Sequence, residues 1–181
     1  MTDKMRRTPA VDDLRPHEAM EFLRRLWERR GPVGEAVRRE LELAFEDVEP
    51  ESVASEVRSV LEELDVDELF DRSGGDSYGY TDLGDAAWQM VEEALAPYVE
   101  RLHQYRALGR NDACDGYALG VLQGIYAFEL ESETAFKPWM ADDARQAFDW
   151  VIAEWHGARQ GAAERQAMKR RLAEACPAWS R

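Results

Sequence analysis

Histidine and cysteine are the side chains most often used for metal binding and nucleophilic catalysis, and this sequence has few of either. His17, His103 and His156 fall on three different predicted helices, with no i, i+4 pair to place two rings on one helix face. Cys114 and Cys176 lie far apart, with no C-x-x-C partner and no histidine at metal-ligand spacing. We therefore expect no metal, no cofactor and no catalytic residue, and we interpret both cysteines as free thiols in a reducing compartment.

The one long predicted loop, residues 72–84, is rich in glycine, serine and aspartate, and such loops often carry binding residues. Asp76, Asp82 and Asp85 do not follow the D-x-[DN]-x-[DN]-G order of a calcium loop. The glycines lack the preceding strand and the following GK[ST] of a phosphate-binding loop. A small-ligand or enzyme pocket near this loop remains an alternative hypothesis.

Six arginines on the first two predicted helices form a basic patch: Arg24, Arg25, Arg29, Arg30, Arg38 and Arg39. Such a patch can contact nucleic acid. Glutamates interleaved at i, i+3 and i, i+4 spacing offer another interpretation, in which the arginines form salt bridges along the helix faces. The net charge of −14 also opposes phosphate binding. A nucleic-acid-associated factor is therefore kept as an alternative function, and nucleic acid is not the expected partner.

The stretch from Glu42 to Asp71 is the most acidic part of the chain, with twelve acids and a single base, Arg58. It fits either a solvated helix face or a docking surface for a basic partner protein. Aromatic residues outside the predicted core complete the candidate partner-binding surface: Tyr78, Tyr80, Trp139 and Trp150. Trp150 falls off the buried stripe of its helix, which fits the edge of the core or a contact surface.

Composition predicts one folded domain. The chain of 181 residues is 45% hydrophobic, which argues against general disorder. We expect a flexible tail over residues 1–12, a single helical domain over 13–176 and a C-terminal tail over 177–181. No signal peptide and no membrane span are predicted, so we expect a cytoplasmic protein. Abundant acids with only three lysines among the bases suggest a halophilic or halotolerant source.

A central buried helix over residues 113–131 organises the predicted fold. Between Ala118 and Phe128 its only polar residue is Gln123, and a helix that is apolar on all sides is a buried one. Gly116, Gly120 and Gly124 recur every fourth residue and so share one face of it. Each costs about 1 kcal/mol of helix stability relative to alanine, which close approach of another backbone would offset.

The remaining periodicity predicts helices joined as antiparallel hairpins. Prolines at the first helical position start helices at Pro16, Pro32 and Pro50. A helix beginning near residue 82 either kinks or restarts at Pro97. Two further helices follow the central one, over about 141–156 and 162–176. No strand pattern is visible, so the predicted fold is all-α with seven or eight helices in a helical-repeat-like array.

Two stretches carry resemblances to known families. YRALGRNDACDGYAL, residues 105–119, resembles the helix-turn-helix joint of a tetratricopeptide-like repeat, with a Leu-Gly turn before small and aromatic residues. From GYTDLGDAAW to the acidic ESE, residues 78–133 are similar to uncharacterised bacterial helical regions, some of which lie beside SWIM-type zinc fingers. The zinc-ligand cysteines and histidines of those fingers are absent here. The resemblances thus imply a helical-repeat-like fold and no catalytic residue.

Helical hairpin stacks present extended grooves that commonly bind peptides or helices. We therefore expect a non-enzymatic protein-interaction or scaffold module with a protein partner.

Overall fold

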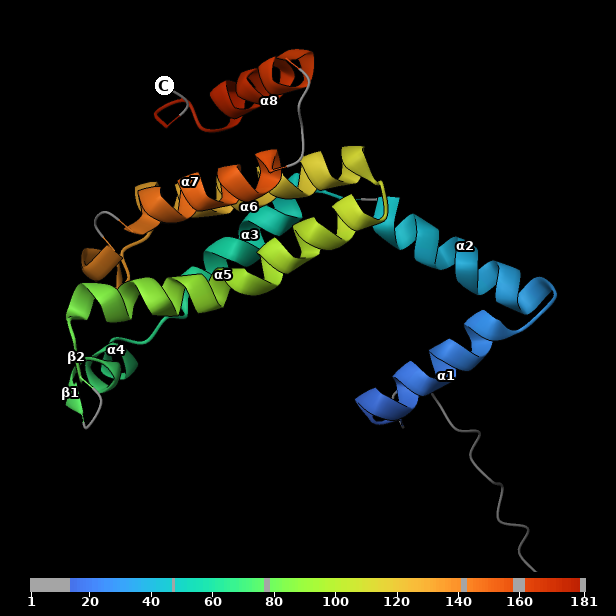
Figure 1. Ribbon diagram of the computed structural model, residues 1–181, viewed down its shortest axis with the longest axis horizontal. Coiled ribbons are helices and arrows are strands. Elements are labelled where there is room, and N and C mark those ends of the chain that lie inside the picture. Colours follow the sequence, from blue (N-terminus) through green and yellow to red (C-terminus); the bar gives the residue numbers. More distant parts are fainter. Residues whose placement is uncertain (1–13, 47, 77–78, 141–142, 158–161, 180–181) are drawn as a thin grey trace, which may run out of the picture. The chain divides into compact units, whose positions relative to one another are not determined.

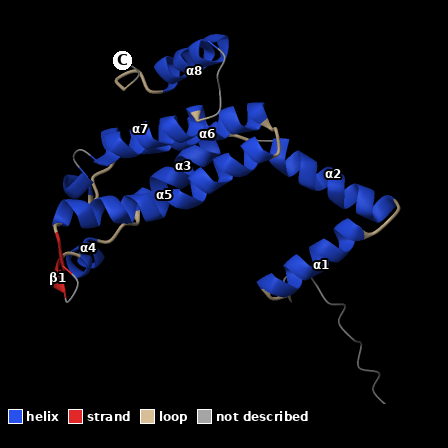
Figure 2. Ribbon diagram, viewed as in Figure 1, coloured by secondary structure: helices blue, strands red, loops and turns tan. Residues whose placement is uncertain are grey.

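The computed structural model describes residues 14–46, 48–76, 79–140, 143–157 and 162–179, with side chains described at all of these except 44, 46, 75–76, 79–80 and 162–165. Within these ranges the fold is all-α, as the sequence predicts, with eight α-helices (Figures 1 and 2). Contacts divide the chain into two compact units, residues 1–44 and 45–181, where the sequence predicts one domain over 13–176. Each unit is described by itself.

The first unit contains a helical hairpin of α1, Pro16–Glu28, and most of α2, Pro32–Glu46. Both helices begin at the predicted prolines, whose missing amide hydrogen is unused in the first turn. The turn between them depends on glycine. Gly31 has a φ of 95°, and a Cβ at Gly34 would lie 1.8 Å from the Arg29 carbonyl oxygen.

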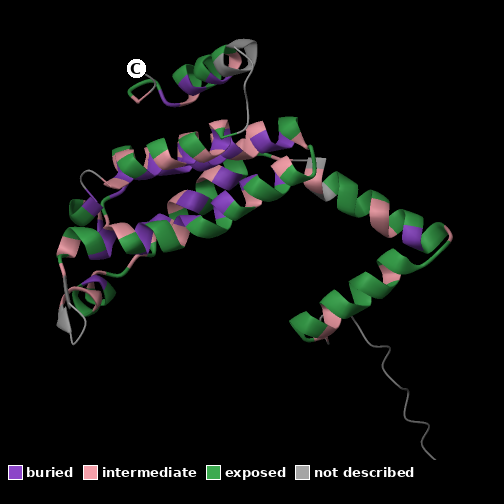
Figure 3. Cartoon of the chain, viewed as in Figure 1, coloured by how far each residue is buried: buried purple, intermediate pink, exposed green. Residues whose placement is uncertain are grey.

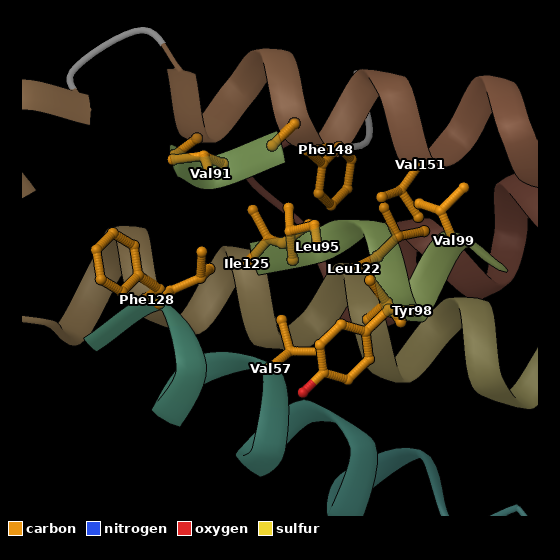
Figure 4. Packing of buried hydrophobic residues seen from close by; sticks show 14 of the residues in the cluster. Val57, Val91, Leu95, Tyr98, Val99, Leu122, Ile125, Phe128, Phe148 and Val151 are labelled. Carbon is orange, nitrogen blue, oxygen red and sulfur yellow. The ribbon is translucent and has the colours of Figure 1, made fainter. Parts of the chain in front are cut away.

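The second unit is built around α6, Asn111–Glu131, which corresponds to the predicted central helix. It packs against α3, Pro50–Glu62, and α7, Asp143–His156, and also contacts α5, Leu83–Ala107 (Figure 1). Fourteen apolar or small residues of α5 and α6 are at most 6% exposed, so both helices contribute to the core. Figure 4 shows buried side chains of α3, α5, α6 and α7 directed into one core.

The glycine face of α6 lies against α3. A Cβ at Gly120 would lie 2.6 Å from the Pro50 carbonyl oxygen, and one at Gly124 would lie 2.7 Å from the Ala54 carbonyl oxygen. Real Cβ atoms do not approach backbone this closely, so α3 can reach this position only because the side chains are missing. Gly116 differs from the other two, because its nearest neighbour, Val48, would be at an ordinary contact distance of 3.7 Å.

The long predicted loop is shorter than expected. Residues Val66–Arg72 form α4, and β1, Gly74–Asp76, pairs antiparallel with β2, Gly79–Thr81, inside the segment predicted as a loop. Asp82 then caps α5 by accepting a hydrogen bond from the Asp85 amide at 2.9 Å. The hairpin has only three residues on each side, too few for an alternating pattern to be visible in the sequence.

Helix α5 runs through Pro97 as one helix of 25 residues. Burial on both sides of the proline, at Leu95, Tyr98 and Val99, keeps the chain helical in spite of the lost hydrogen bond. The chain ends in a 3₁₀ turn η2, Lys137–Met140, then α7 and α8, Ala162–Ala175. Trp179, predicted to lie in a C-terminal tail, packs edge-on against Tyr126 and Phe148 with ring centroids at 5.3 and 5.0 Å.

Candidate functional site

Four aromatic rings form a row across the second unit. Tyr98 and Tyr105 are seven residues apart and so lie on one face of α5, and Tyr117 of α6 contacts both. Ring centroids are 5.4 Å apart for Tyr105 and Tyr117, and 6.5 Å apart for the stacked pair Tyr98 and Tyr117. Phe45 extends the row by meeting Tyr105 edge-on at 5.8 Å. Aromatic pairs in this range favour a fixed arrangement by about 0.5–1.5 kcal/mol each.

Two hollows adjoin this row, and Tyr117 lines both of them. The larger, of about 470 Å³, lies over α3, α5 and α6 and is lined by Glu56, Val60, Glu93, Ala94, Pro97, Tyr98, Arg101 and Tyr117. The smaller, of about 240 Å³, is lined by Val48, Glu49, Ser52, Val53, Tyr105 and Tyr117. We call the two together the tyrosine groove.

The tyrosine groove is acidic. Its lining contains Glu49, Glu56 and Glu93 against one base, Arg101. Glu49 and Glu56 form no ion pair within the described part of the chain, whereas Glu93 binds Arg72 at 2.7 Å. The Arg101 guanidinium lies over aromatic rings, 4.2 Å from the Phe45 centroid and 5.0 Å from that of Tyr105. The guanidinium of this lining residue is therefore in contact with two rings of the aromatic row.

Two of the three groove tyrosines, Tyr98 and Tyr117, are held as neutral phenols. Burial is the main cause that raises the pKa of Tyr117 above its ordinary value, and Tyr98 and Glu56 add to it. Burial also raises the pKa of Tyr98, with smaller contributions from Glu56 and Glu63. Neither hydroxyl has a hydrogen-bond partner among the described residues, although Tyr98 is only 8% exposed. Each phenol can therefore donate to a ligand that enters the groove.

Pro97 adds an acceptor to the same surface. A proline at this position provides no amide hydrogen for the carbonyl of Glu93, four residues earlier in α5. Glu93 and Pro97 both line the larger hollow. The tyrosine groove thus combines aromatic faces, hydroxyl donors and carboxylate and carbonyl acceptors. These are groups suited to binding lysine or arginine side chains, because cations are attracted to both ring faces and carboxylates.

The aromatic residues predicted from the sequence are not part of this groove. Trp139 is 37% exposed and meets Phe70 edge-on at 5.5 Å. Trp150 is half-buried and meets Trp88 edge-on at 6.3 Å, beside a separate hollow of about 650 Å³. Tyr80 lies in β2 with only its backbone described, and Tyr78 lies outside the described residues. The hypothetical pocket near residues 72–84 is not tested, because six of these thirteen side chains, those of residues 75–80, are not described.

The predicted acidic stretch does contribute to the groove. Glu49 and Glu56 belong to it, and they come from the start and the middle of α3. The tyrosines of the groove were not predicted, because their spacing on the predicted helices fits buried core equally well. Tyr98 and Tyr105 are spaced by two helical turns on a predicted helix, and Tyr117 follows in the central helix.

The predicted basic patch is only partly paired. Arg25 forms an ion pair with Glu21, and Arg38 donates to the Trp27 carbonyl at 2.7 Å and lies over its ring. The others form no ion pair with any described residue: Arg24, Arg29, Arg30 and Arg39.

Histidines and cysteines do not assemble into a site in the described ranges. No group of three or more histidine, cysteine or acidic side chains there could hold a metal ion. His103 contacts Glu154 at 2.7 Å, on the surface. Both cysteines are buried free thiols, and burial raises the pKa of Cys176 to about 12, which makes its thiolate inaccessible near neutral pH.

Comparison of the chain with protein-family models, with curated proteins and with solved structures found no match. Among the described residues, no helix has the length and apolarity needed to cross a membrane.

Proposed function

We propose that this protein is a non-enzymatic protein-interaction module whose tyrosine groove binds a basic segment of a partner protein. The observation that carries the proposal is the meeting of a row of aromatic rings with two glutamates, Glu49 and Glu56, that have no ion pair among the described residues. A lysine or arginine side chain entering there would meet ring faces and carboxylates together.

Geometry and charge both favour an extended or helical segment over a small metabolite. The groove is open and its lining comes mainly from three helices, and its two hollows share Tyr117 as a lining residue. Grooves between packed helices commonly accept amphipathic or extended peptides. We further propose that the helical hairpins act as a repeat-like scaffold for this surface, and that the protein works in the cytoplasm, where its two buried thiols stay reduced.

Binding of designed peptides tests the proposal. The probe is a fluorescein-labelled peptide of repeating lysine and leucine, followed by fluorescence anisotropy, with its glutamate–leucine counterpart as the comparison. We expect the basic peptide to bind and the acidic one not to bind. Glu56→Gln should weaken binding by roughly twofold to fivefold, since a surface charge contact is worth up to about 1 kcal/mol.

Glu174→Gln is the matched control, because it removes the same charge from an exposed position on α8. It should leave the affinity for the basic peptide close to that of the wild type. Equal weakening by Glu56→Gln and Glu174→Gln would mean that the peptide responds only to overall charge. That result, or no binding at all, would overturn the groove as the binding site.

A second candidate function is nucleic-acid binding through the basic patch. It is favoured by Arg24, Arg29, Arg30 and Arg39, which have no ion pairs within the described ranges. Its test is a filter-binding titration with duplex DNA and with single-stranded RNA over a salt series. Because phosphate contacts release counterions, a real interaction would weaken steeply as salt rises.

A further inference from the structure

The α1–α2 hairpin has the largest concentration of exposed apolar side chains in the described chain. Seven of the eleven large hydrophobic residues that are exposed lie in it: Met20, Phe22, Leu23, Trp27, Val33, Leu41 and Leu43. The other four are spread over α4, α6, η2 and the end of α5, one in each. Figure 3 shows α1 and α2 coloured mainly as exposed, with shorter intermediate bands on both and a buried band on α2.

These side chains form one prearranged face. Met20, Leu23 and Trp27 follow the i, i+3, i+7 spacing of one side of α1. At the turn, the guanidinium of Arg38 on α2 donates to the Trp27 carbonyl at 2.7 Å and lies 6.0 Å from its ring centroid. The missing side chain at Gly34 lets the two helices meet there. We call this surface the hairpin face.

The hairpin face needs a cover. Helix α1 has 13 residues and none of them is buried. An isolated helix of that length is marginal in water, and most helical stability comes from burying an apolar face. An apolar surface of this size on a soluble protein generally marks an interaction site.

Charge is compatible with a second copy of this chain as the cover. Residues 14–44 carry seven arginines and six glutamates, a net charge of +1 in a chain of net −14. Two copies would repel each other through the acidic remainder and can approach through this segment. The order of charges on α1 is also self-complementary: its first half carries Glu18 and Glu21, and its second half carries Arg24, Arg25 and Glu28, a net charge of +1. A two-fold antiparallel pairing places the acidic half of one helix opposite the basic half of the other.

The area fits as well. Side chains of this size have a total surface of roughly 200 Å² each, so exposed fractions of 38% to 62% leave roughly 700 Å² on each copy. A specific interface buries about 800 Å² on each partner. We propose that the hairpin face is a two-fold self-association surface, on which the hairpins of two copies pack as a four-helix bundle. This inference is independent of the tyrosine groove, whose residues all lie in the second unit.

Sedimentation equilibrium of the full chain over a dilution series tests the proposal. The wild type is expected to approach twice its chain mass of 20.7 kDa as concentration rises. Leu23→Glu places a charge at the centre of the hairpin face and should shift the dissociation constant upward by at least tenfold. Leu130→Glu is the matched control, since Leu130 is exposed by 57% on α6, outside the hairpin, and this variant should remain dimeric.

Circular dichroism of each variant at high concentration separates loss of association from loss of the fold. If the wild-type protein keeps the mass of one chain at every concentration of the dilution series, the proposal is overturned. This holds whatever else covers the hairpin face. A dimer that survives Leu23→Glu and is lost in Leu130→Glu overturns it too. If Leu23→Glu loses global helicity, Met20→Lys replaces it in the comparison with Leu130→Glu, because Met20 is 62% exposed on the hairpin face.

Discussion

The ring of Tyr117 on α6 stacks on the ring of Tyr98 on α5, with centroids 6.5 Å apart and planes inclined by 27°. Two helices that meet in the core thus each contribute a phenol to one acidic groove. This relationship depends on how closely α6 approaches its neighbours. The glycine face of α6 lets α3 lie against it, and α3 contributes Glu56 and Val60 to the lining of the same groove.

Gly120→Ala is expected to destabilise the protein, by about 1–3 kcal/mol, because the new Cβ would overlap the Pro50 carbonyl at 2.6 Å and force α3 away from α6. Gly120→Leu should cost more. Urea unfolding followed by circular dichroism measures the change. Gly116→Ala is the matched control, since its Cβ has room at 3.7 Å from Val48, and helix propensity should stabilise this variant by up to about 1 kcal/mol. Equal stability of the two alanine variants would contradict the close packing of α3 against the glycine face of α6.

Asp115→Ala is expected to destabilise the protein by about 1–3 kcal/mol. The indole nitrogen of Trp155, a residue with no exposed surface, donates to the Asp115 carboxylate at 2.9 Å, and a buried donor without its acceptor is costly. Asp115→Asn keeps an acceptor oxygen and should lose less than half as much. Thermal melts of the two variants decide between them. If Asp115→Asn loses as much stability as Asp115→Ala, then the negative charge of Asp115, and not its hydrogen bond with the Trp155 indole, stabilises the fold.

Stability is expected to fall as pH rises above about 10. The pKa values of Tyr98 and Tyr117 are raised in the folded state, chiefly by burial, so the unfolded chain releases these protons first. Their contribution is fully present below the unfolded pKa and is lost as pH rises through the folded one. Urea unfolding in alkaline buffers measures this slope. In Tyr98→Phe the slope should flatten, and an unchanged slope would contradict the assignment.

Molar salt is expected to stabilise the protein if its source is halophilic. The net charge of −14 is unevenly placed, with twelve acids and one base between Glu42 and Asp71, and salt screens repulsion among them. Thermal melts in low and molar potassium chloride test this expectation. Sucrose at matched osmolarity is the control, because it favours compact states without screening charge. No gain in stability with salt would argue against a halophilic origin.

The helices could be predicted because their signals are local. Pro16, Pro32 and Pro50 start α1, α2 and α3 as the sequence predicts, and the apolar run after Ala113 is the central helix of the second unit. The short β-hairpin and the continuity of α5 through Pro97 were not predictable, since they depend on tertiary burial and on strands of only three residues.

The candidate site was only partly predictable. The acidity of the Glu42–Asp71 stretch fitted either a solvated helix face or a docking surface, and two of its residues, Glu49 and Glu56, line the tyrosine groove. The aromatic partners of these acids come from α5 and α6, and which faces of three helices meet is decided by packing between residues far apart in the sequence. A tyrosine at a helical spacing cannot by itself be distinguished from core, as the 3% exposure of Tyr105 illustrates.

The central claim is that the tyrosine groove holds a basic segment of a protein partner. The most direct measurement is affinity capture from lysate of the source organism, with nuclease, by the wild type and two double variants of equal charge. Glu49→Gln/Glu56→Gln alters the groove, and Glu92→Gln/Glu174→Gln alters exposed acids outside its lining. We predict one discrete protein, identified by mass spectrometry, that is retained by the wild type and the outer variant and lost by the groove variant. Equal capture by both variants, or capture that nuclease abolishes, would contradict the claim.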